Sequence, residues 1–433
     1  MDKRQHLRAS RRFYALLIIG IIMVGLFVFS APVCNAATIE VRPGQLIQDA
    51  INQAVSGDTV FVFSGIYAED IVMESGVTLE GDHYARVILK GKVLFKDEPS
   101  TLKNITILFP ESNLLSYTNS QYSEFKLEND AGITIINSSP IIQNCAIRPD
   151  LETINGLNPE NPALEYYGKA IQIWNLYNNP EISPNIENSL IQDTDCGIYY
   201  FAQAFSGEIL GRIKNNTFYH NKDGVILRMH KENPQMHNNI FDKSGGAAIY
   251  FTYEDGGVFG ERKENINNNL FYENVRNFWC DESQSAFDLI DMQSNISANP
   301  LFISILDGIF YVDPLSPCIR QPGSDNIGAY GSDSIPPILT NILPAESRFT
   351  GSSSIDLSGD VSDNSGILSV SVISNSANSQ QAVVNGAEFS AKNIGVDFGL
   401  NNIDITAKDV AGNETSESRT FYNFHAPVSP PQF

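Results

Sequence analysis

The sequence predicts an all-β protein with two parts, a long solenoid of short stacked coils and a smaller β-sandwich after it. Three observations support this prediction. A short Asn-containing unit recurs between residues 104 and 271, apolar and polar residues alternate beyond residue 337, and no convincing long helical pattern appears after residue 56. Strands bury side chains with a period of two and helices with a period near 3.6, so these patterns favour strands. A chain of 433 residues is long enough for two or three domains.

The repeated unit places Asn between two short apolar runs. Its clearest copies contain Asn188, Asn216, Asn239 and Asn269, which follow one another at 28, 23 and 30 residues. Such a period is typical of a solenoid with loops of variable length. Asn tolerates the left-handed backbone of a tight turn, and its side chain can hydrogen-bond to the next coil. We therefore expect one Asn turn per coil, with apolar neighbours in the core and every coil paired with its neighbours.

One short amphipathic helix is expected before the coils. Apolar residues recur there with helical spacing at Leu46, Ile47, Ala50, Ile51 and Ala54. Strand-like runs bounded by Gly or Asp follow at Thr59–Phe63, Ile71–Met73, Val77–Leu79 and Val87–Leu89.

Two parts of this region resemble the pectin-lyase-like family. Residues Pro43–Ala54, Gly57–Val62 and Gly65–Tyr67 look like the opening of that family, and Asn299–Phe302, Ser316–Ile319 and Asn326–Gly331 look like its closing coil. The resemblance spans residues 38–332. It implies a right-handed parallel β-helix whose first coil is capped by the short helix. Because the family includes lyases, hydrolases, esterases, epimerases and proteins without known chemistry, this fold does not define a function.

Residues 333–337 form the predicted linker, and residues 338–425 the predicted sandwich. Alternating segments at Ser354–Leu357, Ile367–Val372, Ala382–Val384 and Asn402–Ala407 indicate about seven short strands. Residues 363–367, 399–403 and 407–413 resemble bacterial immunoglobulin-like modules, which predicts an Ig-like β-sandwich followed by a tail over 426–433. Asp360, Asp363 and Asp409 are either turn residues or Ca²⁺ ligands.

Residues 1–36 have the order of an export signal. A basic start precedes the apolar run Phe13–Ser30 and a small-residue site that ends at Ala36. We expect cleavage there and a secreted, periplasmic or cell-surface protein. The alternative is an uncleaved anchor, since the run is long enough to span a bilayer, and this segment would then be the contact with the membrane.

Charge and cysteine content narrow the classes of partner. The 50 acidic and 28 basic residues give a net charge of −22, which disfavours nucleic acid as a partner. Cys145, Cys196, Cys280 and Cys318 follow no zinc-binding spacing. Export permits disulfides among them, although small buried core residues are the simpler interpretation, and no pairing can be assigned.

Motifs for catalysis are incomplete. Arg212-Ile213-Lys214 matches a triplet of polygalacturonases, but the upstream Asn-Thr-Asp, Asp-Asp and Gly-His-Gly motifs that accompany it in those enzymes are absent. We expect Ile213 in the core. A lyase would need carboxylates around Ca²⁺ and a base. The candidate ligands are Asp193, Asp195 and Asp223, with Arg228 or Lys231 as the base, against the alternative that these acids are ordinary turn residues.

Alignment of the coils predicts a ligand-binding stripe. Trp174, Phe201, Arg228 and Phe251, spaced 27, 27 and 23 residues apart, fall in one column, and Gln203, His230 and Tyr253 fall in the next. Stacked coils lie about 4.8 Å apart, so such columns are continuous. If Ile198 and Val225 face inward, both columns face outward. Exposed rings with Arg and His suit sugar rings and a uronate group. A register slip of one residue would instead place these side chains in the core.

Two functions remain open at this point. The first is an exported or cell-surface protein that binds, without catalysis, either a polysaccharide or cell-surface glycan or a partner protein at the surface. The second is a polysaccharide lyase or glycoside hydrolase that acts on an acidic polysaccharide, with Ca²⁺ as the candidate ion. The terminal sandwich and the incomplete catalytic motifs favour the first.

Overall fold

The computed structural model describes residues 36–97, 99–110, 131–151, 166–176, 179–203, 206–228, 232–252, 265–280, 294–304, 309–313, 315–319, 326–330, 336–344, 348–363, 367–375, 379–409 and 413–424. The predicted export signal up to residue 35, much of the predicted linker and the terminal tail therefore lie outside the described residues. Within those ranges, no helix combines the length and the apolar character that a bilayer crossing requires.

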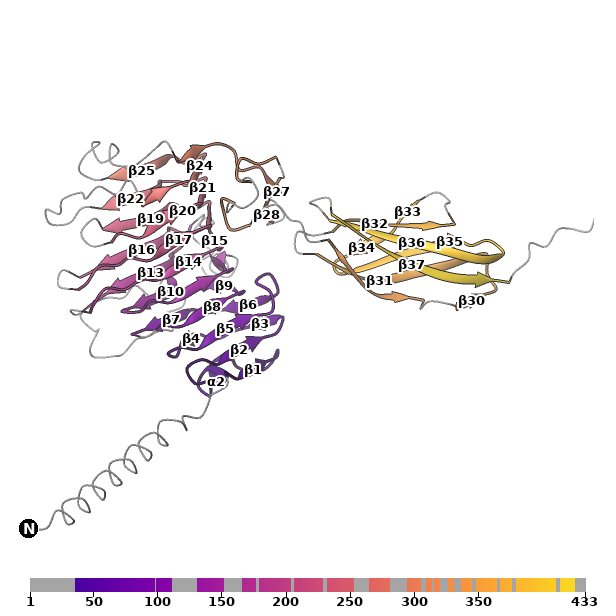
Figure 1. Ribbon diagram of the computed structural model, residues 1–433, viewed down its shortest axis with the longest axis horizontal. Coiled ribbons are helices and arrows are strands. Elements are labelled where there is room, and N and C mark those ends of the chain that lie inside the picture. Colours follow the sequence, from indigo (N-terminus) through magenta and orange to yellow (C-terminus); the bar gives the residue numbers. More distant parts are fainter. Residues whose placement is uncertain are drawn as a thin grey trace, which may run out of the picture.

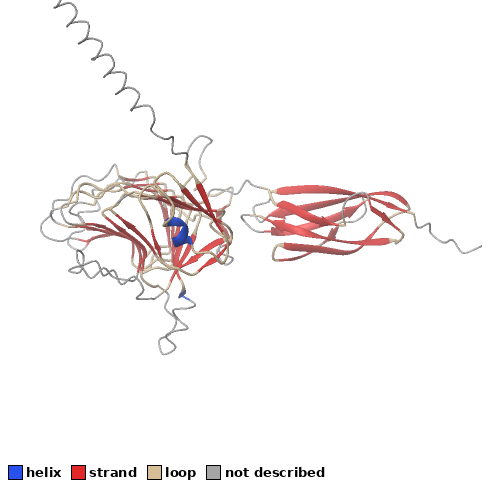
Figure 2. Ribbon diagram, turned by 90° about the horizontal axis from the view of Figure 1, so that it is seen from below, coloured by secondary structure: helices blue, strands red, loops and turns tan. Residues whose placement is uncertain are grey.

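Three parallel sheets, here named A, B and C, wind the chain into a parallel β-helix (Figure 1, Figure 2). Each complete coil contributes one strand to each sheet in the order A, B, C, whereas β1 and β26 belong to incomplete end coils. Each strand pairs in parallel with its counterparts in neighbouring coils. The repeat predicted this architecture.

The strands of the β-helix are short. Sheet A contains β1 (Thr38–Val41), β2 (Thr59–Val62), β5 (Thr78–Gly81), β8 (Thr101–Lys103), β11 (Ile141–Gln143), β14 (Asn185–Glu187), β17 (Arg212–Lys214), β20 (Gln235–His237) and β23 (Ile266–Asn267). Sheet B contains β3 (Gly65–Tyr67), β6 (Val87–Lys90), β9 (Thr106–Phe109), β12 (Ala146–Pro149), β15 (Leu190–Gln192), β18 (Thr217–Tyr219), β21 (Ile240–Asp242), β24 (Leu270–Tyr272) and β26 (Ile296–Ser297). Sheet C contains β4 (Ile71–Val72), β7 (Val93–Lys96), β10 (Ala131–Ile136), β13 (Lys169–Asn175), β16 (Cys196–Ala202), β19 (Asp223–Arg228), β22 (Ala247–Thr252) and β25 (Arg276–Cys280).

Two consecutive residues form the turn between sheets A and B. The sequence predicted that a single Asn provides both the left-handed backbone and the hydrogen bond to the next coil, but these two roles fall on different residues. The first residue adopts the left-handed backbone, as at Asn188, Asn215, Asn238 and Asn268. The second is buried and forms a ladder: Asn239 Oδ1 accepts from the Asn216 backbone N–H at 2.9 Å, and Asn239 Nδ2 donates to Asn269 Oδ1 at 2.9 Å. The predicted alignment is therefore wrong at Asn188, because Ser189 occupies the ladder position in that coil.

The core of the β-helix is a continuous column of apolar side chains. Phe218, Phe241 and Phe271 stack from coil to coil, with ring centroids 4.6 and 5.2 Å apart. Ile213 is fully buried between exposed Arg212 and half-buried Lys214, as predicted. Four cysteines, Cys145, Cys196, Cys280 and Cys318, are buried as free thiols, which confirms the simpler interpretation.

The short helix α2 (Ile47–Ile51) lies beside β1 at one end of the β-helix (Figure 1). Ile47, Ala50 and Ile51 are buried in the core cluster of the coils, whereas Leu46 is exposed. The helix is shorter than the 46–54 pattern, and its role as a cap stays a prediction.

The segment over 299–330 folds back across the outer face of sheet B. It contains the antiparallel pair β27 (Phe302–Ser304) and β28 (Ile309–Val312) and adds no strand to the three parallel sheets described. The backbone N–H of Ala329 donates to Thr217 Oγ1 at 3.0 Å, and the Tyr330 ring stacks on Tyr84 at 5.3 Å. This closing segment therefore covers several coils, which differs from the closing coil that the family resemblance implies.

A second unit follows from residue 338. Its sheets are a four-stranded one, β29-β31-β35-β34, and a five-stranded one, β30-β37-β36-β32-β33. The strands are β29 (Ile338–Leu343), β30 (Arg348–Thr350), β31 (Ser354–Ser362), β32 (Ile367–Ser374), β33 (Gln380–Gln381), β34 (Val383–Asn385), β35 (Glu388–Gly395), β36 (Gly399–Asp409) and β37 (Glu414–Asn423). A separate buried cluster that includes Phe389, Ile405 and Phe421 fills its core. The carboxylate of Asp409 accepts both the backbone and side-chain N–H of Asn413, as a turn residue does.

Candidate functional site

The three outer faces of the β-helix differ in what covers them. Residues of the closing segment, including Phe310 and Tyr330, pack on Ala146 and Leu190 of sheet B. A ligand therefore does not reach that part of sheet B, which leaves the outer faces of sheets C and A as candidate binding surfaces.

The outer face of sheet C carries a column of rings from β16 to β25. In register across the strands lie Gln172, Tyr199, Ile226, Tyr250 and Trp279. Gln172 is buried and donates to Thr134 Oγ1 at 2.8 Å, whereas the four residues after it are half-buried. Because strand side chains alternate between faces, this column lies two residues before the predicted one and was detectable by the same period.

Trp174 and Phe201 form the start of the predicted column and share the outer face. They pair in register, and their ring centroids lie 4.6 Å apart. Both rings are half-buried and pack against buried Leu94, Ile136 and Leu176, and Trp174 Nε1 is buried with no hydrogen-bond partner among the described residues. The prediction of an outward position is therefore confirmed for these two residues, and their role in binding stays a prediction.

Phe251 does not belong to this column, and the predicted register is wrong there. It pairs with inward-facing Leu227 and is only 4% exposed, so it is a core residue. Thr252 takes the position beside Arg228. The cause is the turn from sheet B to sheet C, which is one residue longer in the coil of Phe251 than in the coil before it. In the earlier coil, Val225 follows the left-handed residue His220 by five residues. In the coil of Phe251, Ile249, which pairs with Val225, follows the left-handed residue Lys243 by six.

The remaining predicted stripe residues are only partly described. Arg228 occupies the expected strand position in β19, which is all that the structure describes of it. Gln203 is half-buried just beyond β16. His230, Lys231 and Tyr253 lie outside the described residues.

Cations lie against two of the rings, and one carboxyl lies between them along the sheet. Lys169 Nζ is 5.8 Å from the Tyr199 ring centroid, and the Arg276 guanidinium is 4.0 Å from that of Trp279. Asp223, the first residue of β19, lies in the same row across sheet C as Lys169 of β13 and Arg276 of β25, and between them. Its carboxylate accepts the Ala247 backbone N–H at 2.8 Å. Burial raises the pKa of the Asp223 carboxyl. Such an arrangement can hold rings by stacking and an acidic substituent by charge.

The three predicted Ca²⁺ ligands do not converge. Asp193 bonds with His220 and Gln192, Asp195 is exposed, and Asp223 bonds with Ala247. Among the described residues, no three His, Cys, Asp or Glu side chains lie close enough together to hold a metal ion. The prediction of one site built from these three acids is therefore wrong, and the alternative of turn residues fits their positions.

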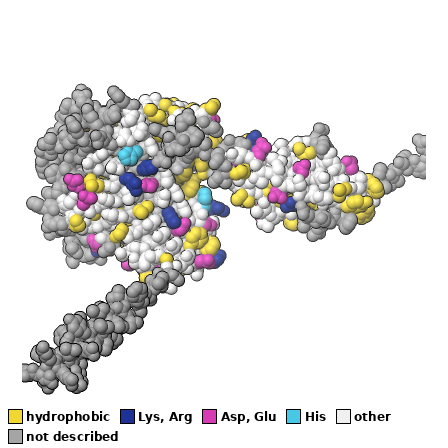
Figure 3. All heavy atoms as spheres, in the orientation of Figure 1, with side chains coloured by type: hydrophobic (Ala, Val, Ile, Leu, Met, Phe, Trp, Pro, Cys, Tyr) yellow, Lys and Arg dark blue, Asp and Glu magenta, His cyan; other side chains and the backbone are white. Residues whose placement is uncertain are grey.

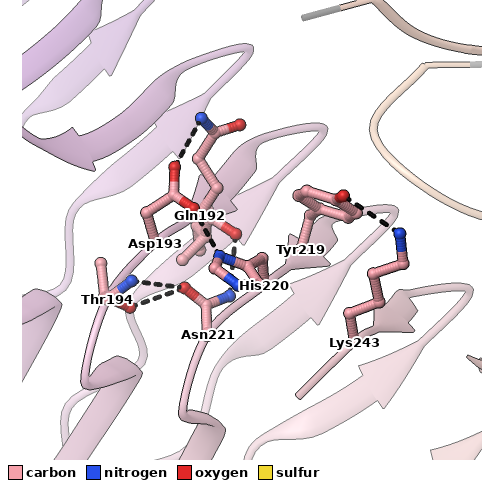
Figure 4. A network of polar contacts seen from close by, with 8 residues as sticks. Gln192, Asp193, Thr194, Tyr219, His220, Asn221 and Lys243 are labelled. Atoms are coloured by element: carbon pink, nitrogen blue, oxygen red, sulfur yellow. Dashed lines mark hydrogen bonds and ion pairs between the residues drawn. The ribbon is translucent and has the colours of Figure 1, made fainter. Parts of the chain in front are cut away.

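A polar network lies at the edge where sheet B turns into sheet C (Figure 4). Asp193 and His220 occupy the same left-handed turn position in successive coils, and His220 Nδ1 lies 2.8 Å from Asp193 Oδ1. Beneath them, buried Asn221 accepts from both the backbone N–H and the hydroxyl of Thr194. The His220 ring also lies 5.0 Å from the Tyr166 ring.

This Asp193–His220 pair was missed from the sequence. A carboxylate on one imidazole nitrogen orients the ring and leaves the other nitrogen for proton transfer. The signal was available, because the two residues are 27 apart, one coil period, and each follows a sheet B strand.

Comparison with known proteins adds no family. No protein-family model and no curated protein sequence matches the chain. Among solved structures, the chain is similar to pectin methylesterase PemA from Erwinia chrysanthemi, with a TM-score of 0.27 and 11% identity over 57% of this chain and 82% of that one. It is also similar to a variant of the PL6-family alginate lyase AlyGC, with a TM-score of 0.24 and 10% identity over 72% of this chain and 61% of that one. At these values neither likeness assigns an activity, and the class is defined by the three sheets themselves as a parallel β-helix protein.

Proposed function

We propose that this is an exported or cell-surface protein that binds a polysaccharide or cell-surface glycan along the outer face of sheet C without altering it. The observation that carries the proposal is the column of half-buried rings from Tyr199 to Trp279, joined by Trp174 and Phe201. A sugar chain that stacks on aromatic rings needs an accessible ring face every few ångströms along its length. Equivalent side chains in successive coils lie about 4.8 Å apart, which provides this spacing.

The electrostatics of this face favour an acidic sugar chain. The protein carries a net charge of −22, which opposes anionic ligands in general. Lys169 and Arg276 concentrate positive charge beside the rings, where a cation and a sugar ring can contact one aromatic group from different sides.

The test is binding of polygalacturonate and alginate oligosaccharides to the full-length mature protein, measured by calorimetry. Tyr250→Ala and Trp279→Ala should each raise Kd roughly tenfold, because a ring contact contributes about 1–1.5 kcal/mol. Phe61→Ala is the matched control, since Phe61 is a half-buried ring on the outer face of sheet A. Ring variants that stay folded and bind as the parent does would refute the proposal. Titration with EGTA present tests the separate proposal that Ca²⁺ assists binding.

The Asp193–His220 pair supports a second candidate, a polysaccharide lyase or glycoside hydrolase. In a lyase, His220 would remove the proton on the carbon beside the uronate carboxyl, and the leaving sugar oxygen would depart as the double bond forms. Incubation with the same uronates should then produce absorbance from unsaturated ends, or new reducing ends for a hydrolase. His220→Gln should abolish either product, while Lys222→Gln, an exposed neighbour, should not.

Three further proposals concern the rest of the chain. Residues 1–36 act as an export signal, so the mature protein from its native host should begin near Ala37 by mass measurement. Helix α2 caps the first coil, so deletion of residues 38–56 should cause aggregation. Residues 338–425 form an Ig-like sandwich with its own core, so its deletion should leave a soluble β-helix.

A further inference from the structure

A hollow lies on the outer face of sheet A, where the strands β14, β17 and β20 begin. Its volume is about 390 Å³, within the range of about 300–1,000 Å³ common for small-molecule sites. Its polar lining consists of Asn185, Arg212, Asn233, Gln235 and Asn265. Figure 3 shows the mixed surface of one side of the β-helix, where charged side chains are scattered among uncharged ones.

The fold places these groups in a row. Asn185, Arg212 and Gln235 are the first residues of β14, β17 and β20 and pair in register, so they form one column across three coils. Asn233 and Asn265 precede their strands and are joined by a 2.6 Å hydrogen bond between their side chains. Asn265 directly precedes Ile266, the partner of Met236, so it continues the row one coil further, and Asn233 lies two residues before Gln235.

Gly211 keeps the floor of the hollow close to the preceding coil. Its φ is +92°, and a Cβ atom there would lie 2.0 Å from the Pro184 carbonyl oxygen. A side chain at this position would push the two coils apart, so only glycine fits. Leu210 beside it adds an apolar surface to the lining.

The lining retains unused hydrogen-bonding capacity. A carboxamide offers two donor hydrogens and one acceptor oxygen, and a guanidinium offers five donor hydrogens. Arg212 Nε donates to Asn185 Oδ1 at 3.4 Å, and the Gln235 side chain has no partner among the described residues. Arg212 also lies 3.4 Å from a Glu187 oxygen, but exposed ion pairs of this kind are weak and exchange readily.

We propose that this hollow binds an acidic oligosaccharide, with carboxamides on the sugar hydroxyls and Arg212 on a carboxylate. Hydroxyl groups both donate and accept, which matches carboxamides, and none of the residues lining the hollow is acidic. Guanidinium groups bind carboxylates through paired hydrogen bonds. The site lies on a different face from the rings of sheet C, so either binding face can exist without the other.

The experiment is calorimetric titration of the full-length mature protein with oligogalacturonate and with oligoguluronate. Arg212→Gln and Gln235→Ala are the test variants. The matched controls are Lys103→Gln, a cation of sheet A that also pairs with a Glu, and Gln143→Ala, a half-buried amide on the same face. Both controls lie outside the hollow. Circular dichroism of all four variants serves as the check that each one is folded.

Each test variant should weaken the binding of at least one of the two uronates by roughly fivefold or more, while both controls bind like the parent. Tyr250→Ala in the same assay separates the two binding faces. This variant should weaken binding at sheet C and leave binding at the sheet A hollow unchanged. Unchanged affinity in Arg212→Gln and Gln235→Ala overturns the proposal, and so does a parent protein that binds neither uronate. Equal weakening in the controls also overturns it, because the loss then reflects net charge or surface amides in general.

Discussion

Mutation of the two consecutive turn residues Asn238 and Asn239 should affect stability to very different extents. Asn239 is fully buried, and its side chain accepts from the Asn216 backbone N–H at 2.9 Å and donates to the Ile213 carbonyl at 2.8 Å. Asn239→Ala leaves both of these groups without that partner in a site that water does not reach. A buried unsatisfied polar group costs about 1–3 kcal/mol, so the substitution should lower the free energy of unfolding by about 2–6 kcal/mol.

The neighbouring position supplies the control. Asn238 adopts a φ of +55° in a conformation that glycine accepts freely, and its side chain has no hydrogen-bond partner among the described residues. Asn238→Gly should therefore change stability by less than about 1 kcal/mol. Asn239→Ser should fall between the two, because Ser189 occupies the same ladder position in another coil and its hydroxyl accepts from Cys145 and donates to Glu187.

Urea titration followed by circular dichroism, with the β-helix transition fitted separately from the sandwich, measures these differences. The ladder argument fails if Asn239→Ala loses less than about 1 kcal/mol, or if the Ala, Ser and Gly variants are equally stable.

Two more predictions test the register and the buried charge. Phe251→Ala should lower the free energy of unfolding by about 3–5 kcal/mol, because its ring fills the core. Thr252→Ala, on the outer face, should lower it by less than about 1 kcal/mol. Equal losses in the two variants would contradict the register. Burial raises the pKa of Asp242 to about 7, so the folded protein holds a proton that the unfolded chain releases near pH 4. The contribution of this group to the free energy of unfolding is therefore fully present below about pH 4. As the pH rises from about 4 to about 7, the free energy of unfolding falls by up to about 4 kcal/mol. Asp242→Asn should be more stable than the parent at pH 8 and equal to it near pH 4 in urea titrations, and a gap that does not change with pH would exclude this cause.

Much of the fold was predictable because every coil repeats the same local physics. Turn chemistry and period-two alternation account for the Asn units, for buried Ile213 between two outward-facing neighbours, and for outward Trp174 and Phe201. The register failed at Phe251 because one extra residue in a Gly-containing turn shifts every later side chain to the other face.

The candidate sites were less accessible to sequence reasoning. The Asp193–His220 contact joins residues of two coils, so it depends on the turn conformation as well as on the period. The hollow on sheet A combines strand starts with connecting loops of different lengths, and no single repeat unit contains it.

The closing segment changes how the coils depend on one another. In a simple solenoid, each coil contacts only its neighbours, so the structure can grow or fray one coil at a time. Here the Gly328 backbone N–H donates to the Asn238 carbonyl, Ala329 binds Thr217, and Tyr330 reaches the ring of Tyr84 near the first coils. Residues 326–330 are among the last of this unit to be synthesised, so the contacts that join early and late coils form only after the whole β-helix has emerged. Until then the coils can pair along their length, and the long-range closure that follows couples the first coils to the last.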